Sequence, residues 1–199
     1  MRPSLSSCTP LSRIAGHETS SSALSWTLYA LARRPAAQHT LRRELRALAL
    51  PASPTAHDLQ AVLALPYLDA VVREALRVHA PVTSTMRVAA QDSAVPVAAP
   101  FRDRRGRRRD CIRLSKGDII SIPLQAVNKR AETWGADAEV FRPERWFEER
   151  EAEAEGVRGL WGGIMTFGSG VVVNGNRSCI GYRFALNECV WLFVVRFSG

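Results

Sequence analysis

One cysteine near the C-terminal end of the chain has surroundings that favour a thiolate. Cys179 lies in the segment Asn174–Gly181, where a glycine-bearing loop meets the expected start of a helix. Backbone N–H groups, the positive end of that helix and the nearby Arg177 guanidinium would each stabilise negative charge on the sulfur. Such a thiolate suits a nucleophile or a metal ligand. A buried, unreactive cysteine is the alternative.

A nucleophilic role for this cysteine would need a histidine as base. The chain has four histidines, and none lies in a known catalytic signature: His17, His39, His57 and His79. The other cysteines, at positions 8, 111 and 189, form no C-x-x-C pair with it. This argues against a zinc cluster and a disulfide framework, and it favours a reducing compartment.

Two further patterns have ordinary structural explanations when each is taken alone, and a third is an unusual segment within a helix. Glu74 and Arg77 stand three residues apart, off the apolar stripe of a predicted helix, where an exposed ion pair would lie. Arg145 follows in the segment Phe141–Trp146. The segment Gly16–Ser22 consists mostly of weak helix formers inside a predicted helix, which favours a local distortion of the kind often found at functional sites.

Together and in this order, the patterns resemble the cytochrome P-450 superfamily of haem-thiolate monooxygenases. The resemblance runs from Ile14 to about Val195 and rests on four segments: Ala15-Gly16-His17-Glu18-Thr19, Glu74-x-x-Arg77, Phe141-x-Pro-Glu-Arg145-Trp and a Gly-x-Arg-x-Cys-x-Gly loop around Cys179. It is closest to fungal microsomal members. The implied fold is mainly α (α-rich α+β), an incomplete cytochrome P-450 fold with a long distal helix, an E-x-x-R helix, small β-sheets and a cysteine haem-ligand loop.

The resemblance implies a role for each residue that contacts the cofactor, haem b (iron protoporphyrin IX). Cys179 would be the axial ligand of the iron, and thiolate donation favours O–O cleavage. Arg177 and Arg87 would pair with the two propionates. Gly181 would allow the helix backbone to approach the porphyrin, and Gly16 begins the oxygen-binding kink of the distal helix.

The same resemblance implies two catalytic and three structural residues. Glu18 and Thr19 would be catalytic, since a hydroxyl beside an acid can organise the water chain that delivers protons to bound dioxygen. A hydroxyl bonded back to a helix carbonyl is the alternative for Thr19. Glu74, Arg77 and Arg145 match the family's structural triad, a buried ion network that fixes geometry.

The implied activity inserts one oxygen atom of O2 into an apolar organic substrate, with electrons from an NADPH-dependent reductase. The family resemblance places such a protein at the endoplasmic reticulum membrane. No apolar run in the chain approaches the ~20 residues that span a bilayer, so the chain expressed by itself is expected in the cytoplasm. A non-catalytic haem-binding remnant or truncated gene product is the alternative. The identity of the substrate is left open.

The chain departs from the family pattern in its length and in its cysteine loop. Family members are more than twice as long, so residues 1–199 are expected to form a single partial domain, the C-terminal haem-binding half without the N-terminal half and the last strands. Poor independent folding is expected. Val171–Gly175 is inserted into the family signature; it could loop out, displace the N–H donors near the thiolate, or reflect a gene-model error.

Apolar periodicity and chain-breaking prolines predict the elements that must position these residues. Helices are expected over residues 11–34, 36–48, 56–63, 66–79 and 182–195. Short strands are expected over residues 85–88, 111–114 and 119–123. The glycine-rich stretch 159–181 is expected to be a loop, and the acidic stretch 148–155 a surface segment.

Composition excludes general disorder and leaves one charged segment to explain. Hydrophobic residues make up 46% of the chain and charged residues 23%, enough for a real core. Arginine supplies 25 of the 27 basic residues, and Arg102–Lys116 holds eight basic against two acidic residues. We expect a solvated basic loop there. A nucleic-acid site is the weaker alternative because the run has no interleaved aromatic residues to stack on bases, so no nucleic-acid partner is expected.

Overall fold

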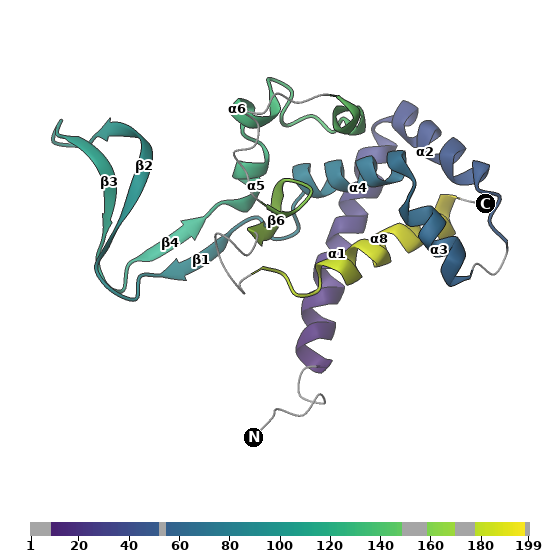
Figure 1. Ribbon diagram of the computed structural model, residues 1–199, viewed down its shortest axis with the longest axis horizontal. Coiled ribbons are helices and arrows are strands. Elements are labelled where there is room, and N and C mark those ends of the chain that lie inside the picture. The colour runs from purple at the N-terminus through teal and green to yellow at the C-terminus, as the bar shows by residue number, and fades with distance from the viewer. Residues whose placement is uncertain (1–8, 52–54, 149–158, 170–177, 198–199) are drawn as a thin grey trace. The chain divides into compact units, whose positions relative to one another are not determined.

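The computed structural model describes residues 9–51, 55–148, 159–169 and 178–197 of the chain (Figure 1). Its helices are α1 (Thr9–Ala32), α2 (Pro35–Ala47), α3 (Ala56–Leu63), α4 (Pro66–Val78), α5 (Leu124–Asn128), α6 (Ala131–Trp134), the 3-10 helix η2 (Pro143–Phe147) and α8 (Tyr182–Phe197). Three antiparallel strand pairs accompany them: β1 (Thr85–Val88) with β4 (Ile119–Ile122), β2 (Ser93–Arg102) with β3 (Arg108–Leu114), and β5 (Gly159–Trp161) with β6 (Ile164–Ser169). The predicted mainly α fold with small sheets is confirmed.

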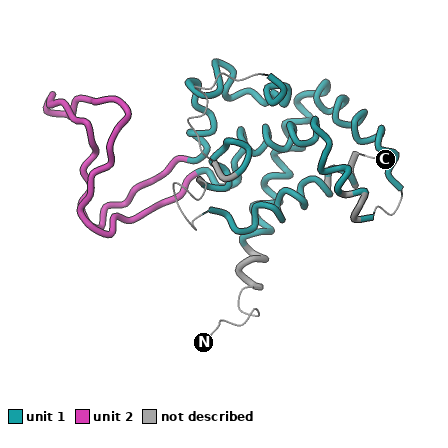
Figure 2. Tube along the Cα trace, in the orientation of Figure 1, with its two compact units in different colours: residues 1–83, 124–199 teal, residues 84–123 magenta. Residues whose placement is uncertain are grey.

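The chain divides into two compact units (Figure 2). Unit 1 comprises residues 1–83 and 124–199 and contains the helices together with the β5–β6 hairpin. Unit 2 comprises residues 84–123 and contains the pairs β1–β4 and β2–β3. The residues that the family resemblance singles out therefore lie mostly in unit 1, and Arg87 lies in unit 2.

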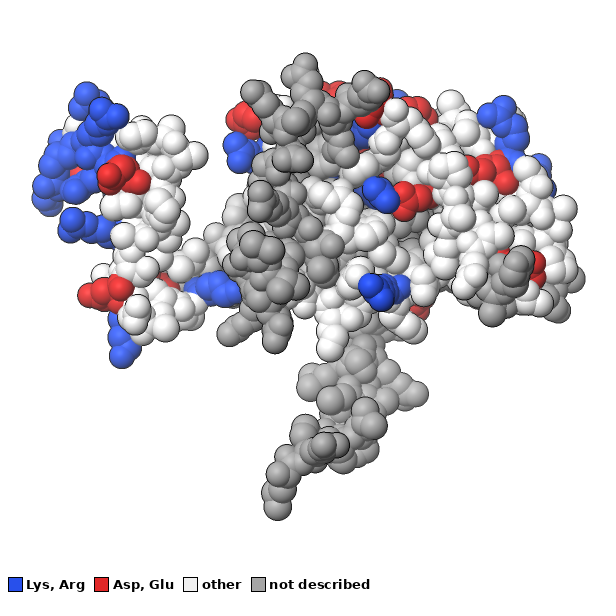
Figure 3. Space-filling model, in the orientation of Figure 1, with Lys and Arg blue, Asp and Glu red and all other residues white. Residues whose placement is uncertain are grey.

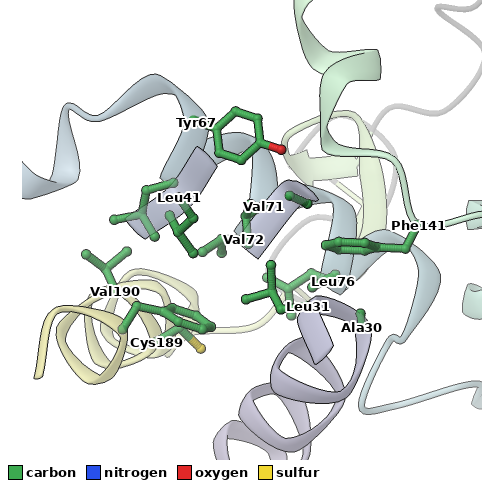
Figure 4. Packing of buried hydrophobic residues seen from close by; sticks show 14 of the residues in the cluster. Ala30, Leu31, Leu41, Tyr67, Val71, Val72, Leu76, Phe141, Cys189 and Val190 are labelled. Carbon is green, nitrogen blue, oxygen red and sulfur yellow. The ribbon is translucent and has the colours of Figure 1, made fainter. Parts of the chain in front are cut away.

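The hydrophobic core of unit 1 lies where α1, α2, α4 and α8 pack together. Leu31 of α1, Leu41 of α2 and Val71 of α4 are completely buried and converge in Figure 4. Phe193 of α8 is 1% exposed. Ten of the thirteen residues of α4 are buried, so this helix is the central element against which the others pack.

Local sequence signals set the starts of three helices. Pro35 and Pro66 begin α2 and α4, at a position where the missing proline N–H costs no hydrogen bond. A capping box begins α3: the Thr55 hydroxyl accepts from the Asp58 N–H at 3.3 Å, and the Asp58 carboxylate accepts from the Thr55 N–H at 2.7 Å. The α3 helix begins and ends where the sequence predicts.

A carboxylate from α2 caps the start of α4. The two oxygens of Glu44 accept hydrogen bonds from the backbone N–H groups of Tyr67 and Leu68, each at 2.9 Å. These first-turn groups have no acceptor within their own helix, and the N-cap residue Leu65 has no side chain able to serve them. The carboxylate also lies at the positive end of the helix. Glu44 thus fixes how α2 meets α4.

The long helix α1 passes through its polar segment without interruption. Residues Gly16–Ser22 are helical throughout, so the predicted local distortion is wrong. Hydroxyl groups in α1 donate to carbonyls one turn earlier: Thr19 Oγ1 to Ala15 O at 2.7 Å, and Thr27 Oγ1 to Ala23 O at 2.6 Å. These bonds satisfy the polar side chains inside a regular helix.

Two segments expected as loops contain strands instead. In the described part of residues 159–181, β5 and β6 form a hairpin in which Trp161 pairs with Ile164. Gly162 and Gly163 make its turn at φ values of +63° and +69°, which favour glycine. In unit 2, β2 pairs with β3, so the basic segment is part of a hairpin. Alanine and proline give β2 a weak strand signal in the sequence.

Replacement of Glu44 by alanine is expected to lower the free energy of unfolding by about 1–2 kcal/mol, because two N–H groups at the start of α4 lose their acceptor. Urea unfolding followed by circular dichroism measures this. The control is Arg43→Ala, an exposed neighbour on the same helix, which should stay within about 0.5 kcal/mol of the parent. Equal stability of the two variants would show that Glu44 does not cap α4.

Candidate functional site: a buried ion network and an exposed cysteine

A single carboxylate joins separate segments of unit 1. Glu74 and Arg77 of α4 are completely buried and form a bidentate ion pair at 2.8 and 2.9 Å. Arg145 of η2, 3% exposed, donates from Nε to the same carboxylate at 2.8 Å. The Trp146 indole N–H and the Arg142 backbone N–H add hydrogen bonds at 3.1 and 2.9 Å. This carboxylate is therefore fully hydrogen-bonded despite its burial.

The two arginines also hold the irregular backbone between α5 and η2. Arg77 Nη1 donates to the carbonyl of Asn128 at 2.9 Å. Arg145 donates to the carbonyls of Trp134 and Asp137 at 3.2 and 3.0 Å. Carbonyl groups in irregular backbone need such partners when water is excluded. The network therefore acts as scaffold for residues 128–147, and its charged groups face one another.

Burial of this network corrects the expectation from helix periodicity. The sequence places Glu74 and Arg77 off the apolar stripe, at an exposed position. In the structure α5 and η2 pack on α4, and η2 brings Arg145 onto the carboxylate. The exposed pair indicated by periodicity alone is wrong because a segment about fifty residues later in the chain covers that side of α4. Glu74, Arg77 and Arg145 lie together and buried, as the family resemblance implies. Apolar periodicity within one helix does not show which later segments of the chain pack against its polar face.

Asn128, at the end of α5, links α4 and α5 to the strand that precedes the cysteine. Its side chain is completely buried: Oδ1 accepts from the Met165 N–H at 2.6 Å, and Nδ2 donates to Thr166 Oγ1 at 2.9 Å. Thr166 in turn donates its hydroxyl to the carbonyl of Leu76 in α4 at 2.7 Å. Sequence reasoning missed Asn128 and Thr166, since each is a single polar residue in a short segment with no distinctive spacing.

Cys179 lies exposed between β6 and α8. Its backbone N–H donates to the carbonyl of Phe167 in β6 at 2.9 Å, which holds the cysteine against the strand. Helix α8 begins at Tyr182, three residues further on. The alternative of a buried, unreactive cysteine is wrong for Cys179.

The surroundings of Cys179 fit a planar apolar group that takes a thiolate ligand. Ile180 is fully exposed, and Phe184 in the first turn of α8 is 70% exposed. Gly181 lies between them, and a Cβ built there would meet no atom within 4 Å. An accessible sulfur flanked by exposed apolar side chains and open space suits haem, whose faces are apolar and whose iron accepts thiolate.

The buried counterpart of this cysteine is Cys189, in the middle of α8. Cys189 is 4% exposed and belongs to the core of unit 1. Desolvation raises the pKa of its thiol to about 11, and the charge of Glu188 adds to the effect. A thiol with that pKa is protonated at neutral pH and is a poor ligand and nucleophile. The two cysteines of this region therefore differ in accessibility: Cys179 is exposed, and Cys189 is buried.

The predicted distal residues lie on the exposed part of α1. Glu18 is exposed, and Thr19 and Gly16 are partly exposed, whereas the buried side chains among residues 15–32 of α1 lie between Ser20 and Leu31. A Cβ built on Gly16 would meet no atom within 4 Å. Helix α1 packs against α8, the helix that follows Cys179. The structure shows no hydrogen bond from Glu18 or Thr19 to described residues outside α1.

Of the two arginines expected at the haem propionates, the structure describes Arg87 and not Arg177. Arg87 lies in β1 of unit 2, where its Nη1 donates to Thr85 Oγ1 at 2.9 Å and to the Met86 carbonyl at 2.8 Å. Arg177 and the insertion Val171–Gly175 lie outside the described residues. The propionate roles of both arginines stay predictions.

Comparison with known proteins shows the family that this fold and these residues define. The cytochrome P-450 family profile matches residues 4–195. The chain is 44% identical over 179 residues to cytochrome P-450 monooxygenase 128 of Postia placenta, covering 90% of this chain and 31% of the relative. It is 38% identical over 175 residues to cytochrome P-450 monooxygenase claP of Ampulloclitocybe clavipes, covering 88% and 31%. The chain belongs to the cytochrome P-450 family.

A third relative, ganoderic acid synthetase of Ganoderma lucidum, is 37% identical over 185 residues, covering 92% of this chain and 33% of the relative. All three relatives are fungal, which agrees with the resemblance found in the sequence. The chain spans about a third of the length of these curated relatives. Among the residues that the structure describes, no helix is long and apolar enough to cross a bilayer.

Replacement of Glu74 by glutamine is expected to lower the free energy of unfolding by about 3–5 kcal/mol, because two buried guanidinium groups lose their counter-charge. The matched control is Asp69→Asn on the same helix, which removes a half-exposed ion pair to Arg73 of 2.6 Å. That change should cost less than about 1 kcal/mol. Urea titrations measure the free energy of unfolding of both variants. Similar losses of stability would show that Glu74 contributes no more to the fold than an exposed ion pair.

Alkylation at pH 8 is expected to modify Cys179 about a hundredfold faster than Cys189, because Cys179 is accessible and the raised pKa of Cys189 leaves almost no thiolate. Peptide mass spectrometry after timed treatment with iodoacetamide gives both rates from one sample. The same reaction in denaturant is the control, and there the two rates should become similar. Similar rates in the folded chain would contradict the placement of α8.

Proposed function

We propose that this chain is the haem-binding part of a fungal monooxygenase and that Cys179 is the axial ligand of haem b. The observation that carries the proposal is the accessible Cys179 sulfur at the start of α8, in a chain of the cytochrome P-450 family. When bound, thiolate-ligated haem supplies the binding of O2 and the cleavage of its O–O bond, and one oxygen atom enters an apolar organic substrate.

The residues around Cys179 prepare the sulfur and the surface beside it. The sulfur of Cys179 is accessible and would bind the iron in its deprotonated form. Ile180 and Phe184 would lose exposed apolar surface against the porphyrin and exclude water from the sulfur, while Gly181 lets the backbone approach. Arg177 is proposed to bind one propionate as a charge-assisted pair.

Glu18 and Thr19 are proposed to move protons to the oxygen site. The Thr19 hydroxyl donates to the Ala15 carbonyl, and its oxygen keeps lone pairs that can accept a hydrogen bond from water. Glu18 is exposed and can exchange protons with solvent. Release of the bond to Ala15 would turn the Thr19 proton toward a bound ligand, with Gly16 leaving room beside the helix.

The remaining proposed roles concern scaffold and partners. Glu74, Arg77 and Arg145 act through the backbone that they hold and touch no substrate. Arg87 is proposed to bind the second propionate. An NADPH-dependent reductase is proposed as the electron donor, and the endoplasmic reticulum membrane as the location. Family membership and the fungal monooxygenase relatives support these assignments. Residues 1–199 are proposed to belong to one cytochrome P-450 domain.

A second candidate function is haem binding without turnover. The observation in its favour is the bond from Thr19 to Ala15, which commits the hydroxyl proton to the helix itself. Turnover of apolar compounds by the haem-loaded chain with a reductase separates the two candidates. Haem ligation without turnover of any offered compound would favour the second.

The central test is optical. The 199-residue chain, loaded with haem, reduced and exposed to carbon monoxide, is expected to show the strongly red-shifted Soret band of thiolate ligation. Cys179→Ala should abolish this band because it removes the ligand, whereas Cys111→Ala, which removes a thiol from β3, should keep it. Haem uptake without the shifted band in folded protein would overturn the assignment of Cys179.

A further inference from the structure

Six arginines are concentrated at one end of the β2–β3 hairpin. Unit 2 contains nine basic and four acidic residues. Six of the basic residues, here called the arginine turn, lie within eight positions: Arg102, Arg104, Arg105, Arg107, Arg108 and Arg109. Figure 3 shows basic side chains gathered over this end of the hairpin. The hairpin therefore presents a strongly positive surface.

Asp103 organises the arginine turn. Its carboxylate accepts hydrogen bonds from the backbone N–H groups of Arg105 and Arg107, both at 2.9 Å, and from Arg109 Nε at 3.1 Å. Gly106 supplies the positive φ of +73° that the turn needs. The hydrogen bond from the Arg107 backbone lowers the pKa of Asp103, so this carboxylate stays charged. An ordered turn presents its charges without the entropic cost of ordering a loose loop.

Much of this positive charge is available to an external anion. Asp103 forms ion pairs with Arg107 and Arg109 at 3.4 and 3.1 Å. Four arginines of the turn form no ion pair with the described carboxylates: Arg102, Arg104, Arg105 and Arg108. Their guanidinium groups can pair with phosphate or carboxylate groups of a partner.

Apolar side chains are exposed on the same hairpin. Val95 and Ile112 pair directly across the two strands, so they lie on one face, and they are 44% and 48% exposed. Phe101, opposite Arg109, is 41% exposed. Basic residues beside exposed apolar residues are the combination that binds the interfacial region of a bilayer with anionic lipids.

We propose that the β2–β3 hairpin docks on the anionic surface of a phospholipid bilayer. The arginine turn meets the headgroups, and Val95 and Ile112, which share one face of the hairpin, enter the interfacial region. A nucleic acid would use the same charges but gains little from Val95 and Ile112, and Phe101 alone is a small stacking platform. This inference rests on the proposed membrane location and names the residues that would contact the membrane. The haem site takes no part in this contact.

Vesicle co-sedimentation of the 199-residue chain tests the proposal. The chain is expected to bind phosphatidylcholine vesicles that contain phosphatidylserine, and to bind pure phosphatidylcholine vesicles far more weakly. Arg104→Glu, Arg105→Glu and Arg108→Glu combined should lower the affinity by at least about a hundredfold, since each basic residue near an anionic surface contributes severalfold. Added salt should weaken binding through screening.

A matched triple variant controls for net charge. Arg33→Glu, Arg34→Glu and Arg43→Glu change three exposed arginines of unit 1 by the same total charge. This variant should bind the anionic vesicles within about threefold of the parent, because these three residues do not belong to the proposed contact surface. Circular dichroism checks that both variants keep the fold. Equal losses in the two triple variants would overturn the assignment to the arginine turn.

A second pair of measurements separates a bilayer from other anions. Val95→Ser with Ile112→Ser should weaken binding to anionic vesicles and leave binding to random-sequence duplex DNA unchanged. Tighter binding of the parent to the DNA, or to polyglutamate, than to the vesicles would overturn the proposal. The carbon monoxide spectrum is recorded on the same samples. A normal spectrum without vesicle binding refutes the docking surface alone, and vesicle binding without the shifted band refutes haem ligation alone.

Discussion

The architecture of unit 1 depends on the burial of one negative charge. An isolated carboxylate in a protein interior costs several kcal/mol, so the Glu74 side chain requires both Arg77 and Arg145 in place. Arg145 comes from η2, far along the chain, and it reaches Glu74 only if residues 124–147 fold back over α4. The charge thus specifies one path for a segment that has little regular structure of its own.

The same network extends to the exposed cysteine through hydrogen bonds. The Asn128 carbonyl accepts a hydrogen bond from Arg77, and its side-chain amide donates to Thr166 of β6. In the same strand, the Phe167 carbonyl accepts a hydrogen bond from the Cys179 backbone N–H. A sulfur that must meet a cofactor has to be accessible, so it cannot be positioned by burial. In this protein a buried scaffold positions the backbone, and the reactive atom remains at the surface.

Carboxylate–arginine pairs serve two different purposes in the two units. Glu74 is buried, and its pairs fix the architecture because no water can replace them. Asp103 lies in a solvated turn, where ion pairs to Arg107 and Arg109 contribute little stability, but its hydrogen bonds to backbone N–H groups order the turn. The surrounding dielectric decides whether such a pair stabilises a fold or arranges charge for a partner.

Local signals and motif order were sufficient to predict the main helices, the strand Thr85–Val88 and the cytochrome P-450 family, because caps, prolines and apolar periodicity act over a few residues. They could not predict the hairpins formed by β2 with β3 and β5 with β6, where pairing compensates for weak strand residues. Periodicity within α4 indicated an exposed Glu74, and the family resemblance implied a buried one. Only the tertiary structure decided that Cys179 is accessible and that Cys189 is inert. Exposure depends on which distant segment packs over a residue, and no short stretch of sequence contains that information.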